Sequence, residues 1–306
     1  MKKRNLGHVI KMDLRRNKSL YLFVLPVILF YALFHYKPMY GAVIAFMDYT
    51  PAREIAGSEW VGLENFIRFF KSPYCTRVIK NTLLLSVYDL IFGFPAPIIL
   101  ALLLNEVKST VFKRFTQTIT YLPHFISLVV ICGMITDFSL SNGIFNDIIV
   151  FFGGERSALL SQPENYRPIY ILSGIWQNIG WGSILYLAAL AGVDQQLYEA
   201  ASIDGAGKWK QLIHVTLPGI VPTIVIQLIL KIGSLMSIGY EKTLLLYNDA
   251  TLETADIIST YVYRSGLQQQ DWSYSTAIGL FNSVINCILL FSANYISKKT
   301  TESSLW

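Results

Sequence analysis

The chain has 306 residues, of which 53% are hydrophobic and 15% are charged, and its mean hydropathy is +0.44. Soluble domains are usually about one quarter charged, and disordered chains are much less apolar. The formal net charge is +5, and the three cysteines suggest no disulfide framework. Nucleic-acid-binding proteins and small disulfide-rich domains are therefore poor fits, and the composition favours a membrane protein.

Six apolar runs are long enough to cross the roughly 30 Å of hydrocarbon in a bilayer as helices. They cover residues 19–36, 82–104, 116–138, 168–193, 219–239 and 275–296. Only helices and closed barrels satisfy their backbone groups in lipid, and these runs lack the alternating pattern of barrel strands. The sequence predicts an all-α, polytopic membrane bundle with six transmembrane helices.

The distribution of basic residues predicts how this bundle is oriented. No small-residue cleavage site follows the first run, which argues against a signal peptide. Lys and Arg are denser in the connecting segments on the side of the N-terminus, which predicts that both termini are cytoplasmic. The expected division is a basic cytoplasmic segment 1–18, a transmembrane domain 19–296 with a cytoplasmic loop 194–218, and a cytoplasmic tail 297–306.

An amphipathic segment lies between the first and second runs. Leu63, Phe66, Ile67 and Phe70 fall on one face of a helix. This pattern fits an interfacial helix on the outer leaflet, and it equally fits a loop helix packed on the bundle.

Polar side chains recur at helical spacing in three of the runs. The stripes are Gly174, Gln177, Asn178 and Trp181, then Thr223, Gln227, Lys231 and Ser234, then Ser275, Gly279, Asn282 and Asn286. Such stripes usually face a bundle interior or a wet cavity, and amide and aromatic groups suit a saccharide. We expect one shared cavity, with the alternative that single members are hydrogen bonds between helices. The substrate-path candidates are Gln177, Asn178, Trp181, Gln227, Lys231, Asn282 and Asn286.

Asp89 and Lys231 are the deepest opposite charges, each roughly 12 Å from the outer end of its span at 1.5 Å per residue. We expect an ion pair that holds the second and fifth spans together. The alternative is that each charge lines a water-filled vestibule alone. Pro95, Pro97 and Pro123 are predicted to kink or break their helices, because proline lacks a backbone donor.

The loop 194–218 shows helix signals of its own. Asp194 is a plausible N-cap, Gly205 a plausible helix stop, and a second short helix is expected from Gly207 toward Pro218. Such short helices are marginal in isolation. Small side chains in the loop permit close approach by another surface, which favours a docking element over a helix-turn-helix that only joins two spans.

The segment Glu199 to Ala206, EAASIDGA, followed by Leu217-Pro218, resembles the EAA motif of permease subunits of bacterial ATP-binding-cassette importers. In that family the motif forms a coupling helix that sits in a cleft of the cytoplasmic ATPase. Glu199 would make a charged contact there and Gly205 the tight turn. The resemblance implies an ATPase-coupling role for Glu199, Ala200, Ala201, Asp204, Gly205 and Ala206.

Further stretches resemble the polysaccharide permeases similar to LplB within the maltose-type carbohydrate importers. They cover residues 36–41, 60–66, 101–106, 117–127 and 275–283. The resemblance implies a maltose-type importer permease fold in the bacterial cytoplasmic membrane and uptake of oligosaccharides or polysaccharide fragments. It also implies three partners: a second homologous permease, a cytoplasmic ATPase dimer, and an extracellular or lipid-anchored solute-binding protein. Membrane lipid surrounds the bundle, and no nucleic-acid partner is expected.

No catalytic site is expected in this chain. Ala206-Gly207-Lys208 is followed by Trp209 where a phosphate loop needs Ser or Thr, so ATP and Mg are expected on the partner ATPase. A membrane enzyme ranks last, because His8, His35, His124 and His214 are scattered and no paired carboxylates share a helix face inside the spans. We expect no metal and no cofactor bound by this chain. The main alternative, an ion-coupled secondary transporter of a polar solute, needs midplane carboxylates and inverted repeats, and neither is clear.

Overall fold

The computed structural model describes residues 12, 16–301 and 304–305. Most of the predicted basic segment 1–18 and part of the tail 297–306 therefore lie outside the described residues. The described part is mostly helical, with one short hairpin in which β1 (Met47–Asp48) pairs antiparallel with β2 (Glu59–Trp60). Met47 lies opposite Trp60.

The α-helices differ widely in length. In chain order they are α2 (Lys18–Tyr31), α3 (Lys37–Met39), α4 (Glu64–Lys71), α5 (Cys75–Tyr88), α6 (Pro95–Glu106), α7 (Thr110–Tyr121), α8 (Leu128–Phe138), α9 (Ile144–Phe151), α10 (Pro163–Ala191), α11 (Gln195–Ile203), α12 (Lys208–Gln211), α13 (Leu217–Gly233), α14 (Tyr240–Leu246), α15 (Leu252–Ala255), α16 (Ile258–Tyr263) and α17 (Trp272–Thr300).

Short turns of other helical types join several of them. The π-helical turns are η1 (Ala32–Tyr36), η3 (Asp89–Gly93), η6 (Leu212–Thr216) and η7 (Arg264–Gln268). The 3₁₀ turns are η2 (Tyr40–Phe46), η4 (Leu122–Phe125) and η5 (Leu159–Ser161).

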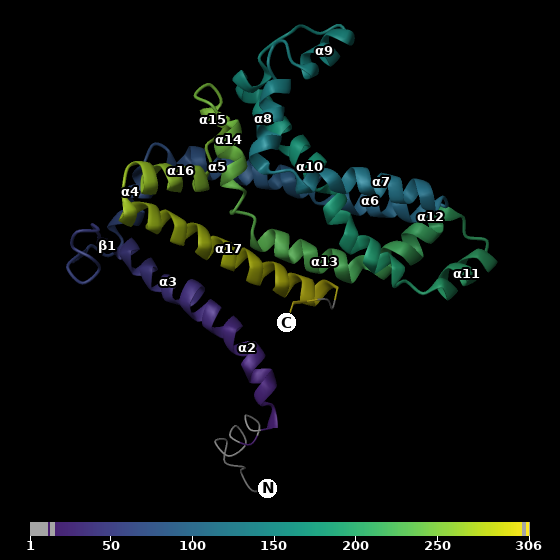
Figure 1. Cartoon of the computed structure of the whole chain (residues 1–306), viewed down its shortest axis with the longest axis horizontal. Coiled ribbons are helices and arrows are strands. Elements are labelled where there is room, and N and C mark those ends of the chain that lie inside the picture. Colours follow the sequence, from purple (N-terminus) through teal and green to yellow (C-terminus); the bar gives the residue numbers. More distant parts are fainter. Residues whose placement is uncertain (1–11, 13–15, 302–303, 306) are drawn as a thin grey trace.

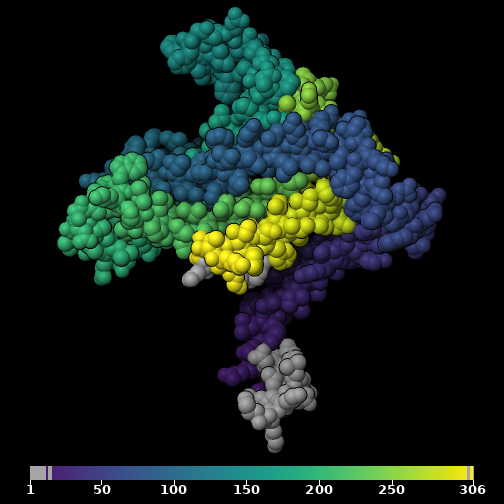
Figure 2. Space-filling view, turned by 180° about the vertical axis from the view of Figure 1, so that it is seen from behind, coloured from purple at the N-terminus to yellow at the C-terminus, as the bar shows by residue number. Residues whose placement is uncertain are grey.

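The body of the molecule is a bundle of long helices (Figure 1). α10 packs against α6, α7 and α13, and α17 packs against α13 and α16. Buried apolar side chains form separate clusters around Leu85, Ile278 and Ile220. α2 leaves this body near the N-terminus, and the teal segment with α8 and α9 stands out on the opposite side (Figures 1 and 2).

Four helical stretches among the described residues are long and apolar enough to cross a membrane, or five if one bent pair is a single span. The four are Lys18–Phe46, Cys75–Glu106, Lys208–Gly233 and Trp272–Thr300. α10 covers the predicted fourth run and has 29 residues. It is not one of the four, because polar residues such as Gln177 and Asn178 lower its mean hydropathy. The chain is thus a multi-pass helical protein, and the predicted count of six stays a prediction.

The predicted third span, 116–138, is bent, and the kink or break expected at Pro123 is confirmed. Thr110–Phe125 and Leu128–Phe138 meet at a bend of 98°. Pro123 lies in η4, Ile126 and Ser127 are extended, and the Ser127 hydroxyl accepts a hydrogen bond from the Val130 N–H at 3.4 Å. Proline and a new N-cap therefore end one helix and begin another here, as the expected break near Pro123 requires.

The second span stays continuous despite its two prolines. η3 precedes Pro95, and the Phe94 N–H donates to the Asp89 carbonyl five residues back at 2.9 Å. Proline cannot donate a backbone hydrogen bond, and a π turn takes up the local mismatch. The predicted disturbance at Pro95 and Pro97 is thus a change of helix type within one helical stretch.

The amphipathic segment forms α4 and packs on the bundle. Asn65 and Phe69 are buried, and the Asn65 amide donates to the Ala45 carbonyl at 3.0 Å. Leu63, Ile67 and Phe70 point outward and are exposed. One face therefore meets the protein, and an apolar face remains open to the surroundings.

Candidate functional site

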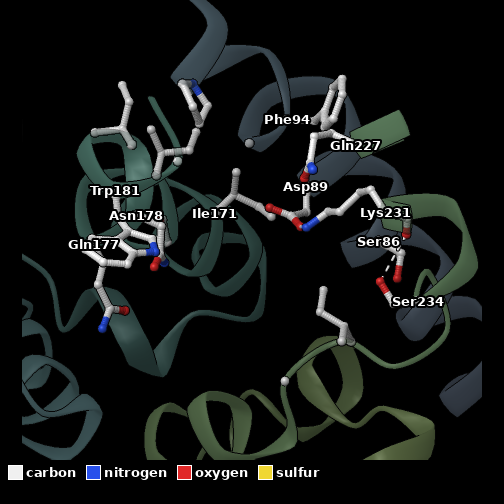
Figure 3. Close-up of a pocket in the computed structure, with 18 of the residues that line it drawn as sticks. Ser86, Asp89, Phe94, Ile171, Gln177, Asn178, Trp181, Gln227, Lys231 and Ser234 are labelled. Atoms are coloured by element: carbon white, nitrogen blue, oxygen red, sulfur yellow. Dashed lines mark hydrogen bonds and ion pairs between the residues drawn. The ribbon is translucent and has the colours of Figure 1, made fainter. Parts of the chain in front are cut away.

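The second-span helix is the continuous stretch Cys75–Glu106, made of α5, η3 and α6. A cavity of about 720 Å³ lies between this helix, α10, α13 and the segment that leads into α14 (Figure 3). Its wall combines amide, hydroxyl, charged and aromatic side chains. The principal lining residues are Ser86, Asp89, Phe94, Pro97, Tyr170, Gly174, Gln177, Asn178, Trp181, Gln227, Lys231, Ser234 and Lys242. Five of the seven predicted substrate-path residues meet here: Gln177, Asn178, Trp181, Gln227 and Lys231.

One wall of the cavity belongs to α10. Gln177, Asn178 and Trp181 lie opposite Lys231 (Figure 3). The Trp181 ring stacks on His124 with ring centres 4.6 Å apart and planes 5° apart. His124 Nδ1 lies 3.1 Å from Asn178 Oδ1. No role was predicted for His124 from the sequence, because only the break after η4 brings this residue to α10.

The opposite charges predicted to pair do lie together. Lys231 Nζ and Asp89 Oδ2 form an ion pair, and the two side chains are 39% and 30% exposed. Figure 3 shows them pointing toward each other across the cavity. A Cβ built on Gly93 would overlap the Asp89 carboxylate, so Gly93 leaves the room that this carboxylate occupies. The pair joins the second-span helix to α13.

Lys242 was not predicted as a site residue. It lies in α14, outside the candidate spans, and its side chain is nearly buried, with 7% exposure. Nζ donates to the Tyr170 carbonyl at 2.7 Å and lies 4.6 Å from the centre of the Tyr170 ring. Burial lowers the pKa of this ammonium to about 8, because desolvation disfavours its charged form. A short helix with little periodicity gives no sequence signal for such a residue.

The sixth-run stripe does not reach this cavity. Asn282 lines a second pocket of about 380 Å³ together with Tyr240, Tyr263 and Trp272. Asn286 instead holds the turn after α13, since its side chain accepts from the Met236 N–H at 2.9 Å and donates to Ser237 Oγ at 2.8 Å. The expectation of one cavity shared by three spans is thus wrong for this stripe, because helical spacing fixes a face and not the neighbour that the face meets.

The loop 194–218 begins as predicted. The Asp194 side chain accepts from the Gln196 N–H at 2.9 Å, which caps α11. Gly205 has φ +73°, a left-handed conformation that favours glycine, and it follows the end of α11. The Gln211 amide donates to Ser202 Oγ and to the Ala206 carbonyl, each at 3.0 Å. These bonds fold the second half of the loop back on the first.

The predicted short second helix is wrong in one respect. α12, η6 and α13 form one helical stretch, Lys208–Gly233, which continues through Pro218. Pro218 stands in the first turn of α13, and the π turn η6 precedes it. Proline lacks a backbone donor, and the π turn before it takes up the local mismatch, so the helix continues through Pro218.

Much of the loop surface is open. Glu199, Ala200, Asp204 and Gly205 are exposed, whereas Ala201 and Ala206 are half-buried. The two most exposed large apolar side chains of the loop are Ile203 at 87% and Trp209 at 77%. Lys208 Nζ lies 3.1 Å from Glu106 Oε2 at the end of α6.

Within the part of the chain that the structure describes, no three His, Cys, Asp or Glu residues are grouped to hold a metal ion. The side chains that line the cavity offer hydrogen bonds, ring faces and fixed charges.

Comparison with known proteins shows the family to which this chain belongs. Residues 93–302 match the family described as binding-protein-dependent transport system inner membrane components, and the chain belongs to that family. This finding confirms the resemblance read from residues 199–206. ATP-binding-cassette permeases are non-catalytic membrane subunits, which agrees with the expectation of no catalytic site.

Three particular relatives are similar over almost the whole chain. Protein LplB of Bacillus subtilis (strain 168) is 47% identical, covering 96% of this chain and 92% of that protein. The polygalacturonan/rhamnogalacturonan transport system permease protein YteP of the same organism is 48% identical, covering 95% and 91%. A chain in the crystal structure of a bacterial alginate ABC transporter, in complex with alginate pentasaccharide-bound periplasmic protein, has TM-score 0.88 and 43% identity, covering 96% and 99%.

Proposed function

We propose that this chain is the permease subunit of an ATP-driven importer of oligosaccharides or polysaccharide fragments and forms half of the translocation path. The observation that carries the proposal is the cavity between the second-span helix, α10 and α13, found in a chain of a binding-protein-dependent transport family. Amide groups such as Gln177 and Asn178 hydrogen-bond sugar hydroxyls, and the exposed Trp181 ring suits the apolar face of a sugar ring. The saccharides named for YteP and for the alginate transporter support the same substrate class.

The loop 194–218 is the proposed docking site for a separate ATPase. Its exposed residues Glu199 and Asp204 offer charged contacts, and Ile203 and Trp209 offer apolar area. Gly205 sets the turn between them. ATP and Mg belong to the ATPase dimer in this proposal, and the chain itself binds no cofactor. The coupling residues are Glu199, Ala200, Ala201, Asp204, Gly205 and Ala206.

The full proposed assembly holds a second homologous permease and an extracellular or lipid-anchored solute-binding protein. The alginate transporter, whose crystal structure includes a periplasmic protein, supports the last of these. We place the chain in the bacterial cytoplasmic membrane with both termini, 1–18 and 297–306, on the cytoplasmic side. Six spans remain our proposal for the domain 19–296, with α10 and the bent pair α7–α8 as the two added to the four apolar helices. The length of α10 supports its inclusion, since about 20 residues cross a bilayer.

The test is uptake of labelled oligosaccharides by membrane vesicles that contain the complete importer, with and without ATP inside. We expect uptake only with ATP. Uptake driven by a proton or sodium gradient alone would contradict the proposal and favour an ion-coupled transporter.

A matched pair of variants ties this transport to the cavity. Trp181→Ala should lower uptake, and Trp176→Ala should not, although both rings lie on α10 and are 47% exposed. Trp181 lines the cavity and Trp176 does not. Equal losses in the two variants would contradict the assignment of the cavity to the path.

A further inference from the structure

The charges in the cavity wall do not balance. Its charged lining residues are Asp89, Lys231 and Lys242, so two ammonium groups face one carboxylate. Asp89 is already paired with Lys231. The remaining positive charge is that of Lys242.

Lys242 forms no ion pair among the described residues, and the charge of Asp89 reaches it only from beyond ion-pair distance. Among the described residues, no carboxylate lies within ion-pair distance of its Nζ, which donates one hydrogen bond, to the Tyr170 carbonyl. An ammonium carries three donors, and a buried charge without a paired partner is costly. Across from it, a Cβ on Gly174 would lie 3.2 Å from Nζ, so the missing side chain leaves α10 open beside the ammonium. The cavity is thus where a counterion for Lys242 would fit.

A second excess of positive charge lies near the N-terminal ends of α5 and α10. The fully buried Asp256 carboxylate accepts from Arg77 at 2.8 Å and from Arg264 at 2.7 Å. Arg167 adds a third guanidinium, which donates to Asn81 Oδ1 at 2.9 Å. The Nε atoms of Arg77 and Arg167 are buried and have no hydrogen-bond partner among the described residues.

This arginine cluster stands on the helices that continue into the cavity. α5 leads from Arg77 to Ser86, and α10 leads from Arg167 to Tyr170, both of which line the cavity. The cluster itself holds three guanidinium groups and one carboxylate, and such an excess of positive charge attracts anions.

We propose that the cavity binds a negatively charged saccharide unit, a uronic acid, whose carboxylate pairs with Lys242. This inference rests on the proposed function, because it assumes that the cavity lies on a saccharide path. Asp89 neutralises Lys231, which leaves Lys242 as the carboxylate contact. The amides of α10 and the Trp181 ring then hold the neutral parts of the same sugar, and the arginine cluster draws the anion toward the cavity.

The ligand side of the experiment needs no variant of the protein. Uptake by the complete importer is measured for oligogalacturonates and oligomers of mannuronate and guluronate, for their carboxyl methyl esters, and for neutral oligosaccharides of equal length. We expect the free acids to be taken up roughly 10- to 100-fold better than their esters, the worth of one charge-assisted hydrogen bond. Uptake of neutral or esterified sugars as fast as the acids would overturn the inference and leave saccharide import intact.

The protein side uses Lys242→Met and Lys242→Arg, with Lys80→Met as the control. Lys80 is an exposed lysine on α5 that does not line the cavity. We expect Lys242→Met to remove the preference for acids over esters, Lys242→Arg to keep it, and Lys80→Met to keep it. The readout is the ratio of acid to ester uptake, which does not depend on how much of a variant reaches the membrane.

Two results separate the possible failures. A Lys242→Met importer that keeps the wild-type ratio of acid to ester uptake would overturn the role of Lys242. Absence of ATP-dependent uptake for every saccharide, with the complete importer present in the membrane, would count against the proposed function itself.

Discussion

The cavity and the loop 194–218 are built in opposite ways. The loop takes its shape from neighbours in sequence: Asp194 caps α11, Gly205 turns the chain, and Gln211 ties the two halves together. The cavity takes its shape from residues far apart in sequence, such as Asp89, Trp181 and Lys231. The loop therefore depends on backbone conformation at single positions, whereas the cavity depends on how closely its helices pack.

The largest expected effect concerns the packing of α10, which forms one wall of the cavity, against α7. A Cβ on Gly180 would overlap the carbonyl oxygen of Thr120, so Gly180→Ala must push α10 away from α7. We expect the free energy of unfolding to fall by about 3 kcal/mol, the upper end of overpacking costs. Thermal unfolding in detergent measures it.

Gly133→Ala on α8 is the control for this substitution, because no heavy atom lies within 4 Å of the added Cβ. It should be neutral or slightly stabilising, as alanine favours helix. An equal loss in both variants would contradict the assignment of the Gly180→Ala loss to the contact of α10 with α7.

The next effect concerns the loop. Gly205→Val places a β-branched residue at φ +73°, which strains the backbone by about 1–3 kcal/mol and displaces the turn. We expect ATP-dependent uptake to fall roughly 10- to 100-fold by the same energy, because the turn is displaced. The unfolding temperature should fall by only a few degrees. Co-purification of the ATPase is the second readout.

Gly207→Ala is the matched control in the same loop. Gly207 has φ −68° and open space around it, so alanine fits without strain. A Gly205→Val protein that transports at the wild-type rate would show that the turn is not needed for coupling.

A smaller effect is expected for the ion pair between Asp89 and Lys231, which joins two walls of the cavity. Asp89→Asn and Lys231→Met should each slow uptake, and the double variant should lose less than the product of the two. Because both side chains are about one third exposed, we expect a coupling of about 1 kcal/mol. Additive losses in the double-variant cycle would mean that the two charges act independently.

The smallest expected effect separates the two asparagines of the sixth run. Asn286→Ala removes two hydrogen bonds to the turn after α13 and should lower the free energy of unfolding by about 1 kcal/mol. Asn282→Ala should cost less, since Asn282 Oδ1 has no hydrogen-bond partner among the described residues. The reverse order, measured by thermal unfolding, would contradict the assignment of Asn286 to that turn.

The sequence predicts well what depends on neighbouring residues. The cap at Asp194, the turn at Gly205, the break near Pro123 and most long helices follow from local chemistry. The pairing of Asp89 with Lys231 was within reach as well, because two opposite charges at equal depth in hydrocarbon have few other partners.

What the sequence misses depends on tertiary contacts. Helical spacing puts Asn282 and Asn286 on one face of α17 but does not say that this face meets the turn at 236–237. His124 reaches Trp181 only because the chain bends by 98° after η4. Lys242 has no pattern around it and is recognised only by its burial next to the cavity.

The continuity of Lys208–Gly233 gives the molecule a mechanical property. Lys208 sits beside the end of α6, and Lys231 stands in the cavity wall about 35 Å further along the same helix at 1.5 Å per residue. Helices transmit displacement along their axis, and this one stays helical through the π turn at Leu212–Thr216. The stretch can therefore act as a lever arm, so that a push on the loop tilts the wall that carries the ion pair without any unfolding between them.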